Sequence, residues 1–332
     1  MSFFSLLAVF ILEQIQPLPY RRLIRNPIEA LASLLAKRFN AGRYQHGMLA
    51  TLIVLGPLLS GLLLLYMFLN VVNPVLGWAL NVLVLYLTMG FRQFSHHYTE
   101  ILLALRNENL PLARQLLADW RYANGVPSPD KPGLEQTEDI AREAIELALL
   151  GAHRHVFSVL LWFVLLPGPI GAVLYRVTAL LACSWERSEK KMGSSPSDFP
   201  LFARRLFVLL DWFPARATAA AFAIVGNFED AVYCARNESS DWSDEATGII
   251  LASAAGALGV RISTRVPLVV SEIPEGLEDL SLTSTEGSRD YDEPFGEVAG
   301  VDFMQSAVGL VWRATVLWVL LLFLLGLASI FG

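Results

Sequence analysis

Charged residues are scarce in this sequence, and so are cysteines. Only 17% of the 332 residues are charged, while 54% are hydrophobic; a soluble globular domain has about 25% charged residues. A chain with so little charge is poorly suited to cover a large water-exposed surface, which favours a membrane protein. The two cysteines, Cys183 and Cys234, match no metal-ligand spacing, and we interpret them as reduced thiols that act as small hydrophobic side chains.

The sequence also lacks the motifs of common soluble enzymes. It contains no phosphate-binding loop, no G-x-G-x-x-G and no G-x-S-x-G. No basic stripe with interleaved aromatic residues is present and the net charge is -6, so we expect no nucleic-acid partner. The histidines lie singly or one to two residues apart, and such neighbours do not share a helix face. We therefore expect polar anchors at a membrane interface and no metal site, with a catalytic or ligand-binding role as the alternative.

The apolar residues are gathered into long blocks. A spanning helix needs about 20 mostly apolar residues, and Gly47 to Leu69 and Ser306 to Phe331 meet that length. Val75 to Phe91 is just long enough, and the short stretch Asn70 to Pro74 makes it the second arm of a helical hairpin. The fold class that follows is an all-α polytopic membrane protein with three transmembrane helices and a helical cytoplasmic region.

Two further apolar segments are harder to place. Ser2 to Leu12 covers about 11 residues, too few for a full crossing, so we interpret it as a short buried or interfacial helix, with a tilted span as the alternative. Val156 to Cys183 is long enough, but Pro167-Gly168-Pro169 divides it. Proline removes a backbone donor and clashes with the preceding turn. Each half alone is too short to cross, so the sequence predicts a re-entrant or broken helical hairpin.

Basic residues set the expected orientation. Six lysines and arginines against one glutamate lie between residues 21 and 43, whereas the hairpin turn is uncharged. The positive-inside rule then places the bulk of the polar region on the cytoplasmic side of the membrane. The predicted parts are an N-terminal apolar helix and basic segment (1–46), a transmembrane hairpin (47–91), cytoplasmic helices (92–155), the re-entrant or broken membrane helix (156–183), cytoplasmic or interfacial helices (184–263), an acidic flexible loop (264–304) and a C-terminal transmembrane helix (305–332).

Ionisable residues beside or inside apolar segments are the candidate site residues, because burying them is costly unless they are paired. Asp198 to Gly226 is predicted to be helical and broken or kinked at Pro214. Asp211 and Arg216 stand out, since they lie five residues apart on either side of this proline. We expect them to form a buried or interfacial ion pair. The functional alternative is a pocket for an anionic ligand, in which arginines act as donors. The full candidate set is Glu13, Arg43, His96, Arg154, Arg176, Asp211, Trp212 and Arg216.

Several separated motifs, in order along the chain, resemble the superfamily that contains AmpE and CbiB/CobD. They are Asn40-Ala41-Gly42-Arg43, His96-His97-Tyr98, Pro167-Gly168-Pro169-Ile170-Gly171-Ala172 and Leu210-Asp211-Trp212-Phe213-Pro214-Ala215-Arg216. The resemblance covers roughly residues 2 to 230 and the C-terminal span, so the acidic loop looks like an insertion. It implies one of two roles. The CbiB/CobD branch makes adenosylcobinamide phosphate by joining an aminopropanol, or its phosphate, to adenosylcobyric acid; AmpE is a non-enzymatic regulator linked to β-lactamase induction.

The sequence departs from the enzyme branch at two places. Where that branch resembles E-x-x-x-E-N-T-x-D-G, this chain has Leu147 to Val156. Where the enzymes carry an acidic pair ahead of N-W-x-P-A-R, this chain has Phe207 and Val208, and Asp211 replaces the asparagine. The missing acids favour the AmpE-like interpretation, a regulator of the bacterial inner (plasma) membrane without catalytic residues or cofactor. Its partners would be the lipid bilayer and a small anionic or cell-wall-derived ligand bound through Arg43, Arg154 and Arg216. The alternative is adenosylcobinamide-phosphate synthase, with a corrinoid substrate, ATP and Mg²⁺; a scaffold without a ligand is a third possibility.

Overall fold

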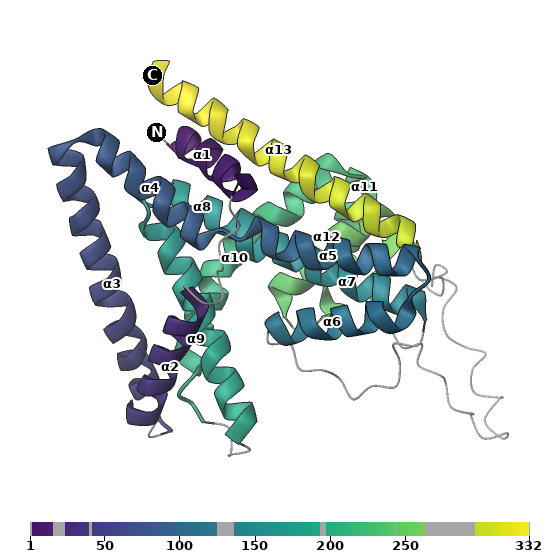
Figure 1. Cartoon of the computed structure of the whole chain (residues 1–332), viewed down its shortest axis with the longest axis horizontal. Helices are drawn as coiled ribbons and strands as arrows, with labels where there is room; N and C mark the ends of the chain where they lie inside the picture. The colour runs from purple at the N-terminus through teal and green to yellow at the C-terminus, as the bar shows by residue number, and fades with distance from the viewer. Residues whose placement is uncertain are drawn as a thin grey trace, which may run out of the picture.

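The computed structural model describes residues 2–15, 24–39, 42–124, 136–192, 197–242, 244–262 and 296–331 (Figure 1). Within these residues the chain is helical, apart from one short pair of parallel strands. The elements are α1 (Ser2–Ile15), α2 (Asn26–Phe39), α3 (Tyr44–Val72), α4 (Pro74–Thr88), α5 (Phe91–Arg106), α6 (Leu110–Asn124), α7 (Thr137–Ala152), a π-helical turn (His153–Phe157), α8 (Ser158–Leu165), α9 (Ile170–Met192), α10 (Leu201–Val225), α11 (Phe228–Asn237), a 3-10 turn (Ser239–Asp241), α12 (Glu245–Leu258), β1 (Val260–Arg261), β2 (Glu297–Val298) and α13 (Val301–Phe331).

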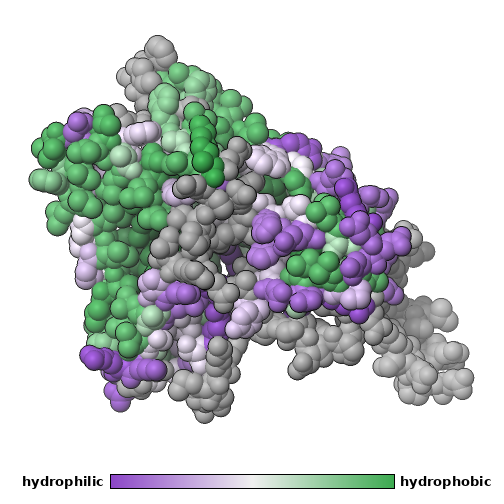
Figure 2. Space-filling model, viewed as in Figure 1, coloured by the Kyte–Doolittle hydropathy of each residue, from purple (hydrophilic) through white to green (hydrophobic). Residues whose placement is uncertain are grey.

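The all-α polytopic fold class is confirmed. Among the residues that the structure describes, four helical stretches are long and apolar enough to cross a membrane: Tyr44–Val72, Thr137–Leu165, Leu201–Val225 and Val301–Ala328. The first and last correspond to predicted spans, whereas the middle two include segments that the sequence assigned to cytoplasmic helices. The predicted second span is α4, an apolar helix of only 15 residues. Figure 2 shows the apolar surface concentrated over the part of the molecule that contains α3 and α4, and the polar surface toward α5 and α6.

Pro167-Gly168-Pro169 does break the helix, as predicted. The structure differs in the length of the two arms, because α8 continues from α7 through the π-helical turn and α9 runs for 23 residues. The expectation that each half is too short to cross is therefore wrong for the first arm, which belongs to the apolar stretch Thr137–Leu165; α9 is long enough, but it is not among the stretches that are also apolar enough. Gly168 has a φ of +66°, and a Cβ there would lie 2.8 Å from the Tyr66 ring. The tip of the hairpin thus lies beside the later part of α3, and α9 returns along α3.

The start of α10 is fixed beside the start of α3. A Cβ on Gly47 would overlap the carbonyl oxygen of Phe199, so only glycine permits this approach of the two backbones. The rings of Tyr44 and Phe202 meet edge to face at 5.9 Å, and the Asp198 amide donates to the Gly42 carbonyl at 3.2 Å. At about 1.5 Å of rise per residue, a residue near position 211 lies roughly 18 Å further along α10.

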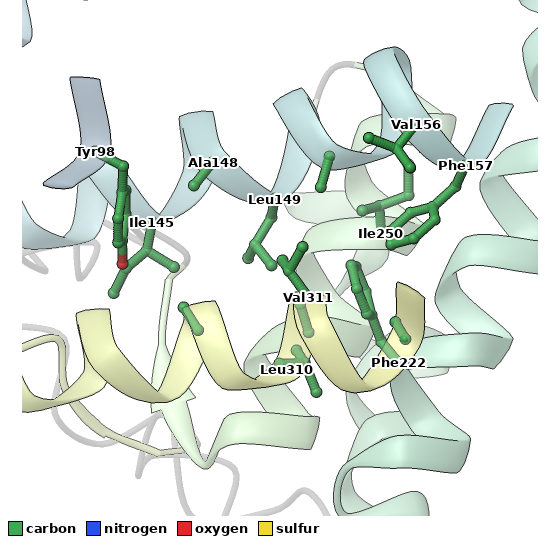
Figure 3. Close-up of a cluster of buried hydrophobic side chains, with 14 of the residues drawn as sticks. Tyr98, Ile145, Ala148, Leu149, Val156, Phe157, Phe222, Ile250, Leu310 and Val311 are labelled. Carbon is green, nitrogen blue, oxygen red and sulfur yellow. The ribbon is translucent and has the colours of Figure 1, made fainter. Parts of the chain in front are cut away.

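A second bundle of helices forms the main hydrophobic core. Side chains from α5, α7, α10, α12 and α13 meet there, as Figure 3 shows for Leu149, Phe222, Ile250 and Leu310. The Tyr98 hydroxyl also donates to the Met304 carbonyl at 2.7 Å, which ties α5 to α13. The predicted acidic loop lies largely outside the described residues, since 263–295 are not among them; its end forms β2 and the first turn of α13.

Candidate functional site: a buried polar network at a π-helical turn

The π-helical turn His153–Phe157 interrupts the long helix formed by α7 and α8. Such single turns inside α-helices are uncommon and occur frequently at functional sites. The turn directs His153, Val156 and Phe157 into the protein, while Arg154 is exposed. The sequence contains no helix-breaking residue here, so the turn depends on the contacts that its side chains make with neighbouring helices.

His153 is the centre of a buried polar network. Its ring Nε2 lies 3.0 Å from Oδ1 of Asp211 on α10, and its Nδ1 lies 2.9 Å from the Thr218 hydroxyl on the same helix. The Ser158 hydroxyl on α8 is 3.3 Å from the ring. Because an ionised carboxylate can only accept, Nε2 carries a proton and donates it to Asp211. The network therefore joins the π-helical turn to α10 at two points.

Asp211 receives a second hydrogen bond from a third helix. The Tyr175 hydroxyl on α9 donates to the same Oδ1 at 2.7 Å. One turn away, Pro214 lacks the N–H that would bond to the Leu210 carbonyl. The indole N–H of Trp162 on α8 donates to that carbonyl at 3.0 Å. A neighbouring helix thus satisfies the group that proline leaves open, which is how proline is tolerated inside apolar helices. This explains why α10 continues through Pro214 without the predicted break.

The polar network around His153 is deeply buried. The side chain of His153 is 1% exposed and that of Asp211 is 5% exposed, inside helices that are apolar enough to enter a membrane. Removing such groups from water is costly, and ionisable residues in this setting are usually functional.

A cationic cluster lies next to the network. Arg176 on α9 is buried, and its Nη2 lies 2.7 Å from Nδ1 of His155 in the π-helical turn. Its Nη1 donates to the Arg154 carbonyl at 3.5 Å. Arg154 acts electrostatically on both Asp211 and Tyr175. The site thus combines a buried carboxylate with an exposed arginine at the protein surface.

The predicted Asp211–Arg216 pair does not form. Arg216 is paired with Glu245 on α12, and its guanidinium lies over the Trp212 ring, 4.0 Å from the ring centre. Trp212 itself is half exposed. Residues five apart on an α-helix are rotated by about 140° from each other, so without a break at Pro214 the two side chains point to different faces. Arg216 therefore belongs to a surface contact and not to the buried network.

The remaining candidate residues are dispersed. Arg43 is exposed directly before α3, at the level of Phe199, so Arg216 lies roughly 25 Å further along α10. Arg43, Arg154 and Arg216 thus do not converge on one ligand. Glu13 is buried on α1, and His96 is exposed on α5, 3.5 Å from Glu100. Burial lowers the pKa of the neighbouring His97 below its ordinary value of 6.5, and the Glu100 carboxylate partly opposes this effect.

Sequence reasoning missed four members of the network, which are His153, Ser158, Tyr175 and Thr218. A signal was present for His153, because its helical neighbours Leu149, Ala152 and Phe157 are all apolar, as expected for an inward-facing position. The small hydroxyl residues gave no distinct signal, since Ser and Thr in apolar helices commonly bond to their own backbone. Their roles appear only once α8 and α10 are placed side by side.

No metal centre is found in the part of the chain that the structure describes. No group of three or more His, Cys, Asp or Glu side chains among these residues could hold a metal ion. A cavity of about 310 Å³ lies at the α5–α6 turn, where Glu100, Asn107 and Asn109 supply its polar lining. It shares no residue with the network around His153, and nothing in its lining suggests a specific ligand.

Comparison with known proteins places the chain in a family. The profile of the family described as CobD/Cbib protein matches residues 9–267. A protein of Stutzerimonas stutzeri named cobalamin biosynthesis protein CobD is 32% identical over 267 residues, which cover 78% of this chain and 81% of that protein. Proteins of the same name from Chromobacterium violaceum (31% identity, 57% of each chain) and Leptospira interrogans (26% identity, 59% of this chain and 60% of that protein) also match. No solved structure matches.

These matches correct the main functional prediction. The relatives are consistently named for cobalamin biosynthesis, so the interpretation as a non-enzymatic AmpE-like regulator is wrong. The departures from the enzyme pattern misled that interpretation, because acids were missing at expected positions along the sequence. The family match covers more than three quarters of the chain, and we conclude that this chain belongs to the CobD/CbiB family of membrane proteins.

Proposed function

We propose that this protein is a membrane-embedded enzyme of cobalamin biosynthesis, an adenosylcobinamide-phosphate synthase. The observation that carries the proposal is the 32% identity to a protein named cobalamin biosynthesis protein CobD along most of both chains. The substrates would be adenosylcobyric acid and an aminopropanol or its phosphate. The reaction would form an amide bond: the amine nitrogen bonds to a carboxyl carbon of the corrinoid and loses a proton, while the carboxyl C–O bond breaks and its oxygen leaves on the phosphoryl group that ATP has transferred to it.

The two departures from the synthase pattern support this assignment when they are viewed in space. His153 lies within the divergent stretch 147–156, and Asp211 replaces the asparagine of the second motif. In the structure these two residues contact each other at 3.0 Å. Changes that meet in one hydrogen bond are consistent with mutual compensation, in which an imidazole and a carboxylate together replace other polar groups. The altered motifs therefore do not require that the site has lost its activity.

The role that we propose for the His153–Asp211 pair is positioning. Both side chains are buried, so they do not face a substrate directly. Their hydrogen bonds hold the π-helical turn against α10, and the turn in turn presents Arg154 to the surface. The ionised carboxylate also places a negative charge close to Arg154. We propose that the pair orients the exposed arginine.

ATP would supply the energy to remove the carboxyl oxygen, with Mg²⁺ as its counter-ion. Mg²⁺ prefers carboxylate and other oxygen ligands. Among the described residues no group of three or more His, Cys, Asp or Glu side chains could hold a metal ion, and no step is derived through the metal. The proposal for this chain therefore concerns its own helices, the buried network and the arginine that adjoins it.

Genetic complementation tests the proposed function. The gene is expressed in a bacterial strain that lacks its adenosylcobinamide-phosphate synthase, and growth that depends on newly made cobalamin is measured. We expect restored growth, and we expect the purified protein in detergent to convert adenosylcobyric acid, the amine and Mg-ATP into a product with the mass of the amide. Failure of both assays, with the protein present and folded in the membrane, would rule out the synthase assignment.

A further inference from the structure

We propose that Trp162 is a positioning residue for the proposed reaction, and that its indole N–H makes the α8–α9 hairpin a clamp on α10 beside Asp211. The inference rests on the proposed function and deepens it, because it extends the site from the buried His153–Asp211 pair to the hairpin that holds the pair in place. Trp162 acts through the backbone of α10, on the position of the Asp211 carboxylate.

The first observation is the place of the proline in α10. Pro214 has no N–H to donate to the Leu210 carbonyl, and Leu210 directly precedes Asp211. A proline inside a helix kinks or breaks it unless another group satisfies the carbonyl that it leaves open. Nε1 of Trp162 donates to this carbonyl at 3.0 Å. The course of α10 at Asp211 therefore depends on a side chain from another helix.

The second observation is that both arms of the hairpin hold the same point of α10. Trp162 on α8 bonds to the carbonyl just before Asp211, and the Tyr175 hydroxyl on α9 bonds to the Asp211 carboxylate at 2.7 Å. Ser158 lies four residues before Trp162, so the two share a face of α8. The Ser158 hydroxyl is 3.3 Å from the His153 ring. The hairpin thus contacts both members of the buried pair.

The third observation is that the hairpin is itself closely held. Its two arms approach each other tightly, because a Cβ on Gly171 would overlap the Trp162 carbonyl oxygen. At the tip, a Cβ on Gly168 would lie 2.8 Å from the Tyr66 ring of α3. A shift of one arm therefore also moves the other. Because the tip packs against α3, the hairpin is a fixed support against which α10 is placed.

Steady-state kinetics of the full-length protein in detergent test this role with Trp162→Phe, which keeps an aromatic ring but removes the N–H donor. We expect kcat/KM, measured per folded enzyme, to fall about tenfold or more, because small displacements of a positioned group have large effects on rate. The matched control is Trp78→Phe. Trp78 packs against the main core, and its buried indole N–H has no hydrogen-bond partner among the residues that the structure describes. Its loss removes no bond, so kcat/KM should stay within about twofold of the wild type.

Pro214→Ala separates positioning from packing. Alanine supplies the N–H that proline lacks, so the Leu210 carbonyl regains a donor from its own helix. In the Pro214→Ala background, Trp162→Phe should therefore lower kcat/KM by a factor about five times smaller than in the wild-type background. If Trp162 only filled space, the loss would be the same in both backgrounds. Equal losses, or a Trp162→Phe enzyme as active as the wild type, would overturn the inference.

Amide hydrogen exchange of the same proteins separates this inference from the proposed function. We expect Trp162→Phe to raise exchange of α10 around residues 207–218 about fivefold or more, Pro214→Ala to reverse this rise, and α13 to stay unchanged. If no synthase activity is found but this local change is seen, the clamp stands and the synthase assignment fails. An equal rise in α10 and α13 would mean that Trp162 serves general stability, and it would refute the clamp. Unchanged exchange in α10 would refute it as well.

Discussion

Two polar residues on one helix, Asp211 and Arg216, have opposite environments. Asp211 is buried among three helices and accepts hydrogen bonds from His153 and Tyr175, whereas Arg216 lies over the exposed Trp212 ring and pairs with a surface glutamate. The pair at Asp211 is removed from water, so its loss would leave buried partners unsatisfied. The pair at Arg216 is partly solvated and contributes little. Two charged residues that lie close together in the sequence can thus form ion pairs that contribute very differently to the stability of the protein.

The largest expected effect is from Asp211→Ala. This change leaves the His153 N–H and the Tyr175 hydroxyl buried without their acceptor, and breaking a buried pair costs about 3–5 kcal/mol. We expect a correspondingly lower free energy of unfolding in detergent, measured by thermal or denaturant unfolding. Arg216→Ala is the control on the same helix. If the two variants unfold alike, the contrast between the buried and the surface pair is incorrect.

A double-mutant cycle sharpens the comparison by measuring which residues are coupled. His153→Gln and Asp211→Asn, alone and together, should show a coupling free energy of about 1–3 kcal/mol, as is typical of residues in one hydrogen-bond network. The corresponding cycle of Asp211→Asn with Arg216→Gln should give a value near zero. A strong coupling between Asp211 and Arg216 would instead restore the ion pair predicted from the sequence.

Gly47→Ala tests the close contact between the start of α3 and the start of α10, the helix that carries Asp211. The added Cβ would overlap the Phe199 carbonyl oxygen, and such overpacking costs about 1–3 kcal/mol. Gly61→Ala lies in the same helix with open space around it, so we expect no loss of stability there, because alanine is the better helix former. Unfolding of both variants in detergent gives the comparison. Equal stability of the two would mean that α10 does not begin against α3.

The smallest effect is expected from Arg216→Gln. It removes a partly solvated ion pair and a contact with Trp212, which together should change the free energy of unfolding by less than about 1 kcal/mol. Raising the salt concentration should weaken the wild-type contribution further, since exposed charges are screened. A loss as large as that of Asp211→Ala would show that Arg216 has a structural role that its surroundings do not suggest.

Much of the helical order could be read from the sequence. The break at Pro167-Gly168-Pro169, the hairpin of α3 with α4 and the long C-terminal helix all follow from local rules about proline, turns and apolar length. The continuity of the helix through residues 153–155 was harder to predict, because three polar residues in a row resemble a helix end at a membrane surface. The structure satisfies two of them inside, His153 with Asp211 and His155 with Arg176, so the helix has no need to end.

The site was less predictable than the fold. Asp211 and Arg176 were among the candidates because ionisable residues in apolar segments stand out. Their partners could not be identified, since His153, Tyr175 and Asp211 are brought together from the π-helical turn, α9 and α10 by tertiary contacts alone. The spacing of Asp211 and Arg216 itself argues against an ion pair, because five residues place two side chains on different faces of an unbroken helix. We expected the pair because we assumed a break at Pro214. Trp162 removes the need for that break by bonding to the carbonyl that proline leaves open.

The central claim is that the function depends on the buried network around Asp211 and not on the surface pair of Arg216. Its most direct test is complementation of a synthase-deficient strain by two variants at matched membrane levels. We predict that Arg216→Gln restores cobalamin-dependent growth as the wild type does, and that Asp211→Asn does not. Full growth of the strain that carries Asp211→Asn would contradict the account. So would a lack of growth with Arg216→Gln while the strain with Asp211→Asn still grows.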